Sequence, residues 1–190
     1  IKLGIKEIPV NVIPIAGSAM DSHVADRRIK LISFTGSGDV GWGIKKKSDR
    51  QKVSLELGGN AGVIVNHDAD IASAAAKIAI GGFAQAGQSC ISVQRVYVHE
   101  SIYENFRTKL LEETAKLKFG DPYNDDTAIG PMITTEEAKR AEKWVTEAKS
   151  AGAVILTGGN RNGAVLEPTV IENAPDHVNV KCAEVFAPVI

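Results

Sequence analysis

The sequence has 190 residues, of which 44% are hydrophobic and 24% charged, and its formal net charge is −1. This length suits one sizeable domain or parts of two, with enough apolar residues for a core without disulfides. The near-zero charge gives no electrostatic basis for a nucleic-acid partner or for binding to a membrane surface. No signal peptide is visible and no apolar stretch reaches the length of a membrane span, so we expect a cytoplasmic protein.

The two cysteines, Cys90 and Cys182, form no cluster with the four histidines that has metal-ligand spacing. No metal site is therefore predicted. The small number of cysteines favours a reducing compartment, although the sequence alone leaves a disulfide open. The sequence begins with IKLG and stops within the patterned segment FAPVI, which suggests a piece of a longer protein.

In chain order, short apolar runs between Gly and Pro residues predict strands at 10–14, 31–34, 53–57, 62–65, 95–98 and 154–156. Several of these runs are almost continuously apolar, which is typical of strands buried on both faces of a parallel sheet. The glycine pair Gly58-Gly59 directly follows one of the strands. If the chain contains two domains, we expect the boundary at this pair.

Four helices are predicted between the strands. The first begins at about Val40 and ends in the lysine run 45–47, which we interpret as its solvated end. The second, 70–83, is rich in Ala and apolar nearly all round, which predicts burial on most faces. The other two begin with capping-box patterns at Ser101 and Thr134. Strands that alternate with helices indicate an α/β fold.

A glycine-rich loop, FTGSGDVG at 34–41, matches the G-x-G-x-x-G dinucleotide pattern. A predicted strand precedes it and a predicted helix follows, so backbone N–H groups at a helix N-terminus could face a phosphate. The match alone is weak, and a plain strand-to-helix turn is an equal alternative. Glu56 lies twenty residues after Gly36, about where the pattern places an acidic ribose ligand.

Cys90 lies in the turn GQSC between the apolar helix and a predicted strand. A cysteine in a glycine-bearing loop is better placed to react than one on an apolar helix face. The nucleophile is the thiolate, which a free thiol with a pKa of ~8.5 supplies poorly at neutral pH unless its surroundings lower that pKa. The alternative is a small buried hydrophobe, and Cys182 fits that alternative better.

Glu56 lies between two leucines at the end of the apolar strand VSLEL. Partial desolvation there would raise its pKa towards values useful for a general base. The alternative is that Glu56 points outwards to solvent, because the period of two would place Ser54 and Glu56 on one polar face. On these residues alone, the outward orientation is slightly favoured.

Taken together, these motifs resemble the aldehyde dehydrogenase superfamily. The resemblance rests on FTGS, then LELGG, then GQSC and finally EVFAPV in this order, with KFGDP, IGPMI, TGG and EPTV between them, and it covers essentially the whole sequence. The phrase GQSCISVQRVYV is nearest to the lactaldehyde and non-phosphorylating glyceraldehyde-phosphate branches. The resemblance implies a three-layer α/β/α fold with a parallel sheet, in which 1–58 ends a Rossmann-like cofactor domain and 59–190 forms most of a catalytic domain.

The resemblance also implies roles for individual residues. Cys90 corresponds to the nucleophile that forms a thiohemiacetal and then a thioester with the aldehyde, and Glu56 to the base that activates the hydrolytic water. The cofactor is NAD or NADP, and the residues that correspond to its contacts are Thr35, Gly36, Ser37, Val40, Gly41, Leu57, Glu184 and Phe186. Glu184 corresponds to the ribose ligand, so Glu56 no longer has that role. The implied partners are a small aldehyde and further copies of the protein, as a homodimer or homotetramer.

The sequence departs from the family pattern in two respects. The asparagine that supplies a second oxyanion donor, a lysine near the ribose and the first βα units of the cofactor domain have no counterpart in it, so these 190 residues alone are expected to lack useful dehydrogenase activity. Asn60 also stands where the family commonly has Lys. Two other functions remain open, namely a non-catalytic nucleotide-binding or interaction module and, with little support, a cysteine hydrolase.

Overall fold

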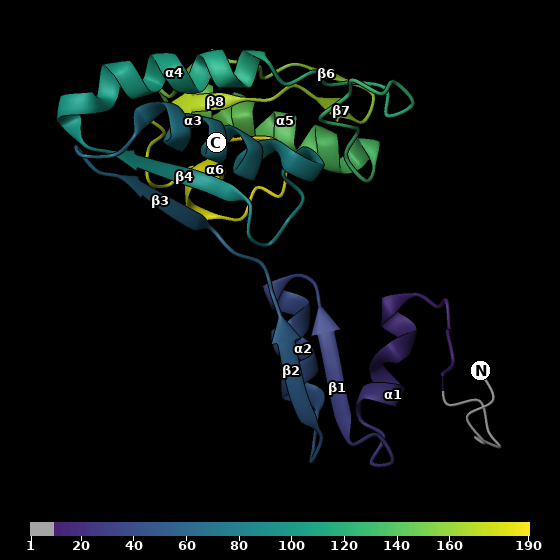
Figure 1. The fold of residues 1–190 in the computed structure, drawn as a ribbon. Helices are drawn as coiled ribbons and strands as arrows, with labels where there is room; N and C mark the ends of the chain where they lie inside the picture. Colours follow the sequence, from purple (N-terminus) through teal and green to yellow (C-terminus); the bar gives the residue numbers. More distant parts are fainter. Residues whose placement is uncertain (1–9) are drawn as a thin grey trace, which may run out of the picture. The chain divides into compact units, whose positions relative to one another are not determined.

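The structure is a computed structural model that describes residues 10–190 and divides into two compact units, Ile1–Gly58 and Gly59–Ile190 (Figure 1). In the first unit, two short helical turns, η1 (Gly17–Met20) and α1 (Asp21–Val24), precede strand β1 (Leu31–Thr35), helix α2 (Gly38–Lys47) and strand β2 (Lys52–Glu56). β1 and β2 pair in parallel, and α2 is the crossover that connects them. The lysine run forms the last turn of α2, as predicted, where cations favour the helix dipole.

Two expectations for the first unit are wrong. Residues 10–14, a predicted strand, belong to no helix or strand, and Val10, Val12 and Ile13 are 70%, 88% and 61% exposed. A strand needs a neighbouring backbone to pair with, and Pro14 has no N–H to offer one. The expected burial of strands on both faces also fails in this unit, because exposed and half-buried residues alternate along β1 and β2.

The second unit combines three long helices with several short strands. Its elements are β3 (Ala61–Val65), α3 (Ile71–Phe83), η2 (Ala84–Gly87), β4 (Val93–Val98), η3 (Glu100–Ile102), α4 (Tyr103–Ala115), α5 (Thr135–Ser150), β5 (Val154–Thr157), β6 (Arg161–Asn162), β7 (Val165–Leu166), β8 (Val170–Glu172) and α6 (Asn179–Cys182). β3 and β4 pair in parallel, whereas β5 with β8 and β6 with β7 pair antiparallel. The strand pairing is therefore mixed rather than purely parallel.

The main hydrophobic core lies in this second unit. α3 packs against α4, and Figure 1 shows the two helices side by side. Phe83 at the end of α3 is fully buried, together with Ile129, Leu166 and Val185 from later segments. Although α3 is apolar nearly all round, Ile80 is 62% exposed, so one of its faces is uncovered within this unit.

Of the two predicted capping boxes, one forms its N-cap hydrogen bond, while its Glu137 carboxylate accepts from Arg140 instead of from the N-cap N–H. Thr134 is the N-cap of α5, and its Oγ1 accepts a hydrogen bond from the N–H of Glu137 at 3.2 Å. Ser101 is no cap, because it lies inside η3, and its N–H donates to His99 Nδ1 at 3.2 Å. The sequence pattern assigns the N-cap to Ser101, but the His99 ring acts as the N-cap acceptor instead.

Candidate functional site

In the first unit, the parallel pair of strands brings the predicted glycine loop beside Glu56. Thr35 lies opposite Glu56 in the ladder, and the N–H of Gly36 donates to the backbone oxygen of Glu56 at 3.0 Å. Both segments are therefore at the carboxyl ends of β1 and β2. In α/β sheets this is the edge at which ligands bind.

The loop leads directly into the N-terminus of α2. Ser37 is the N-cap residue in an extended conformation, and its side chain makes no capping hydrogen bond. The N–H groups of the first turn are thus not occupied by that side chain, and Val40 beside them is 52% exposed. A phosphate fits such a terminus, although Asp39 in the same turn places a negative charge there.

Gly41 and Leu57 contact each other in the first unit. A Cβ built on Gly41 would clash with Cδ2 of Leu57 and would lie 3.3 Å from the Phe34 ring. A larger residue at position 41 would force the Leu57 side chain to move, so the close approach of α2 to the end of β2 favours glycine there. This packing explains Gly41 without a ligand.

Glu56 is exposed within its unit, on the same face of β2 as Lys52 and Ser54. The outward orientation, which the residues alone slightly favoured, is thus the one found in the first unit by itself, and the alternative of partial desolvation between two leucines is not. The period of two along the strand turns both leucines inwards and the carboxylate outwards.

In the second unit, Cys90 lies in a loop with an unusual backbone. Gln85, Ala86 and Gly87 all have left-handed φ angles, of 53°, 54° and 67°. Gln88 then fixes the loop with both ends of its amide, because its Nε2 donates to Gln85 O at 3.2 Å and its Oε1 accepts from the N–H of Ile133 at 2.9 Å. Cys90 emerges from this loop as an exposed free thiol.

Gly59 brings Cys90 and Glu184 together within the second unit. Its N–H donates to Oε1 of Glu184 at 2.9 Å. A Cβ built on Gly59 would lie 2.9 Å from the backbone oxygen of Cys90, closer than real Cβ contacts, so only glycine fits here. The candidate nucleophile and the candidate ribose ligand, far apart in sequence, therefore flank one residue.

Cys182 and Phe186 lie two residues before and two residues after Glu184 in the chain. Phe186 is 40% exposed and has a φ of 51°, which turns the backbone sharply two residues after Glu184. Cys182 is exposed and free, so its interpretation as a small buried hydrophobe is wrong. It lies at the end of the four-residue helix α6, which is too short to cover it.

The sequence reasoning singled out neither Gly59 nor Gln94 as a site residue. Gln94 lies in β4 and is 9% exposed, and its side chain contacts the chain on both sides of Glu184. One signal was present in the sequence. The valines of the strand VQRVYV predict that one of its faces is buried, and a glutamine on a buried face must find polar partners.

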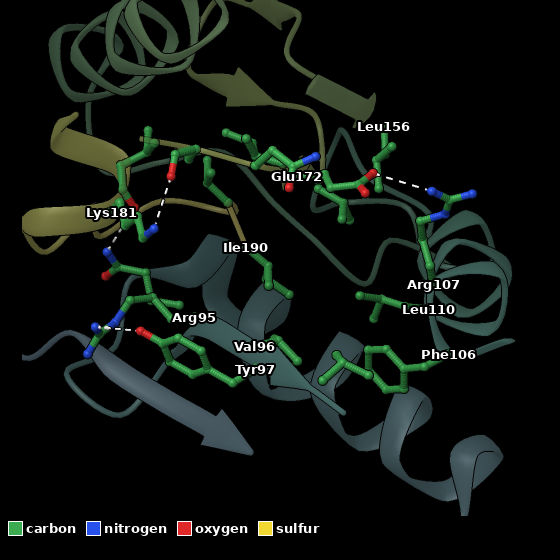
Figure 2. Close-up of a pocket in the computed structure, with 18 of the residues that line it drawn as sticks. Arg95, Val96, Tyr97, Phe106, Arg107, Leu110, Leu156, Glu172, Lys181 and Ile190 are labelled. Atoms are coloured by element: carbon green, nitrogen blue, oxygen red, sulfur yellow. Dashed lines mark hydrogen bonds and ion pairs between the residues drawn. The ribbon is translucent and has the colours of Figure 1, made fainter. Parts of the chain in front are cut away.

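A pocket of about 310 Å³ lies elsewhere in the second unit (Figure 2). Its apolar lining includes Val96, Phe106, Leu110, Leu156 and Ile190. Arg107 and Glu172 form an ion pair at 3.5 Å across it, and burial together with the Glu172 carboxylate raises the pKa of Tyr103 to about 12. Gln94 and Lys181 border this pocket, but none of the site residues expected from the sequence does, so we assign no part of the chemistry to it.

Among residues 10–190, no three His, Cys, Asp or Glu side chains are grouped so that they could hold a metal ion. Within the same range, no helix has both the length and the apolar character needed to cross a bilayer.

Comparison with known proteins shows which family the chain belongs to. A family model described as "Aldehyde dehydrogenase family" matches residues 2–190. The 3-sulfolactaldehyde dehydrogenase of Priestia aryabhattai is 49% identical over 162 residues, which cover 85% of this chain and 34% of that protein. The chain thus spans about a third of the length of this curated relative.

Solved structures give the same result. The glyceraldehyde-3-phosphate dehydrogenase GapN of Methanocaldococcus jannaschii, complexed with NADP, matches with a TM-score of 0.88 and 39% identity over 92% of this chain and 38% of that one. The betaine aldehyde dehydrogenase of Staphylococcus aureus, in complex with NAD⁺, matches with a TM-score of 0.86 and 35% identity over 92% and 37% of the two chains. The α/β fold expected from the sequence is confirmed.

Proposed function

The chain belongs to the aldehyde dehydrogenase family, and from this premise we propose that Cys90 forms the covalent intermediate in the oxidation of an aldehyde to a carboxylic acid, a reaction that these 190 residues alone are expected not to complete. One observation carries the proposal. The exposed thiol of Cys90 and the carboxylate of Glu184 belong to segments that meet at Gly59, so a nucleophile and a ligand for a cofactor share one site.

In this proposal the thiolate of Cys90 attacks the aldehyde carbon and forms a tetrahedral thiohemiacetal. The backbone N–H of Cys90 donates to the oxyanion, and such a donor is typically worth about 3 kcal/mol. When bound, NAD⁺ or NADP⁺ would supply the hydride acceptor, and loss of the hydride from the substrate carbon would convert the thiohemiacetal on Cys90 into a thioester. Glu56 then takes a proton from the water that hydrolyses the thioester, which releases the acid and restores the thiol.

We assign the cofactor to residues of both units. Thr35, Gly36, Ser37 and Val40 would face its pyrophosphate and nicotinamide, with the α2 N-terminus as the anion site. Leu57 would lie near the nicotinamide, and Gly41 supports the loop through its packing on Leu57. Glu184 and Phe186 would hold the ribose.

The assignment makes Ile1–Gly58 part of the cofactor domain and Gly59–Ile190 part of the catalytic domain. For the substrate we propose a small aldehyde, with lactaldehyde and 3-sulfolactaldehyde as the first to assay, because relatives bear these names. We further propose that the protein is a cytoplasmic homodimer or homotetramer. Light scattering measures its oligomeric state.

An activated ester tests the covalent chemistry without a cofactor. p-Nitrophenyl acetate acylates a reactive thiolate directly, so we expect it to acetylate Cys90 and to leave Cys182 unmodified at neutral pH. Access alone does not produce this difference, because both thiols are exposed. Peptide mass spectrometry locates the acetyl group, and Glu56→Gln should retain it for longer because hydrolysis lacks its base.

Cys90→Ser is the variant that should lose the acetyl group, and Cys182→Ser is its matched control. Slow and equal acetylation of both cysteines would contradict the proposed function. It would favour the alternative of a nucleotide-binding module, which needs no nucleophile.

A further inference from the structure

Gln94 makes a set of hydrogen bonds that none of the proposed chemistry uses. It lies on β4 and is almost fully buried. Its Nε2 donates to the backbone oxygen of Ala183 at 2.5 Å and to that of Val180 at 3.4 Å. Its Oε1 accepts from the N–H of Val185 at 3.1 Å. The Gln94 side chain thus gives hydrogen-bond partners to the carbonyls of Val180 and Ala183 and to the N–H of Val185, as a neighbouring strand would.

The two closest partners of Gln94 bracket Glu184. The carbonyl of Ala183 and the N–H of Val185 belong to the residues directly before and after it in the chain. Fixing groups on both sides of a residue limits the directions in which its side chain can point. The Glu184 carboxylate is directed to the N–H of Gly59 at 2.9 Å.

Asn60 adds a second support to the same segment. Its Nδ2 donates to the backbone oxygen of Lys181 at 2.8 Å. In Figure 2, Lys181 of this segment lies across from Arg95, the neighbour of Gln94 on β4. The asparagine that departs from the family pattern is therefore used to anchor the chain three residues before Glu184.

We propose that Gln94 is a positioning residue that holds Glu184 against the Gly59 N–H and thereby places the carboxylate for the cofactor ribose. This inference rests on the proposed function, because it takes the role of Glu184 from there. A methionine at position 94 would fill similar space but would leave the Ala183 carbonyl and the Val185 N–H without their partner. A buried group that loses its hydrogen bond reorients towards another partner or towards water.

Gln51 of the first unit provides a matched control. It is 8% exposed, and its amide makes three hydrogen bonds to backbone groups, as that of Gln94 does. Its Nε2 donates to Val24 O and Asp26 O at 3.1 and 3.0 Å, and its Oε1 accepts from the N–H of Asp49 at 2.8 Å. Gln51→Met therefore removes an equivalent buried amide whose hydrogen bonds all lie within the first unit.

Amide hydrogen exchange, followed by NMR in the 190-residue chain, tests the positioning. Gln94→Met should reduce the protection of the Gly59 amide by about tenfold, the effect of one lost hydrogen bond, while α3 and α5 keep theirs. Gln94→Glu, which keeps an acceptor for Val185 but loses the donor to Ala183, should fall between wild type and Gln94→Met. Gln94→Glu also tests the inference by itself if Gln94→Met does not fold. Gln51→Met should leave Gly59 unchanged.

Unchanged protection of Gly59 in both Gln94 variants would overturn the inference, whatever the cofactor does. Equal losses in Gln94→Met and Gln51→Met would also overturn it, since the effect would then be general destabilisation. NAD⁺ and NADP⁺ titrations of the same variants separate this result from the proposed function. If Gly59 loses protection and nucleotide affinity weakens about tenfold, both the positioning by Gln94 and the proposed cofactor role of Glu184 hold. If only Gly59 changes, Gln94 still positions Glu184, and the cofactor role of Glu184 is wrong.

Discussion

Tyr103, at the wall of the pocket in Figure 2, shows how burial changes a single residue. Burial, and then the neighbouring Glu172 carboxylate, raises its pKa from 10.0 to about 12. The neutral phenol is favoured in the folded state. Its contribution to stability is therefore fully present below pH 10 and is lost as the pH rises through about 12. The other tyrosines, Tyr97 and Tyr123, are 48% and 94% exposed.

Ultraviolet absorbance of tyrosinate measures the titration of Tyr103. We expect the phase at about pH 12 to disappear in Tyr103→Phe and to move to lower pH in Glu172→Gln, which removes the nearby negative charge. Tyr123→Phe, at the most exposed tyrosine, should leave that phase unchanged. A phase at about pH 12 that persists in Tyr103→Phe would contradict the burial seen here.

At the scale of elements, two copies of one sequence pattern have different outcomes. Thr134 caps α5 through the Glu137 N–H, whereas Ser101 lies inside η3 and does not cap α4. Thr134→Ala should therefore lower the free energy of unfolding by about 1 kcal/mol. Ser101→Ala, the matched control, should cost less because no helix N-cap is lost. Urea denaturation measures both, and equal losses would show that the cap at Thr134 contributes nothing specific.

The same contrast shows what can be predicted from the sequence. Strands 31–34, 53–57, 62–65, 95–98 and 154–156 and the helix over 70–83 form close to their expected limits, because periodicity and caps act within a few residues. The strand at 10–14 and the cap at Ser101 fail because each depends on a partner that a local pattern does not specify. The burial of Glu56 and Cys182 depends on neighbouring segments in the same way.

The site itself illustrates this limit most clearly. Cys90 could be proposed from its glycine-bearing loop, but Glu184 could be proposed only because its motif resembles a family, and neither spacing nor periodicity brings the two together. Their meeting at Gly59, and the hydrogen bonds of Gln94 to both sides of Glu184, join segments about ninety or more residues apart. Contacts at such separations are set by the whole fold, so local sequence reasoning could not find them.

At the scale of the whole molecule, the two units differ in how much core they bury. Val24 is the one hydrophobic residue among 10–58 that is buried, whereas the main core cluster lies entirely in residues 59–190. Apolar burial is the dominant favourable contribution to folding, and small units bury the smallest fraction of their surface. We therefore expect the first unit to unfold at a lower denaturant concentration than the second.

The two tryptophans make this measurable, because each unit contains one. Trp42 lies on α2 and is 63% exposed, and Trp144 lies on α5 against the core of the second unit. In Trp144→Phe, fluorescence reports only on the first unit, and in Trp42→Phe only on the second. The urea midpoint followed through Trp42 should be the lower one, and circular dichroism should show two steps. A single transition at one midpoint would mean that the units unfold cooperatively, and that the first is stabilised by more than its own core.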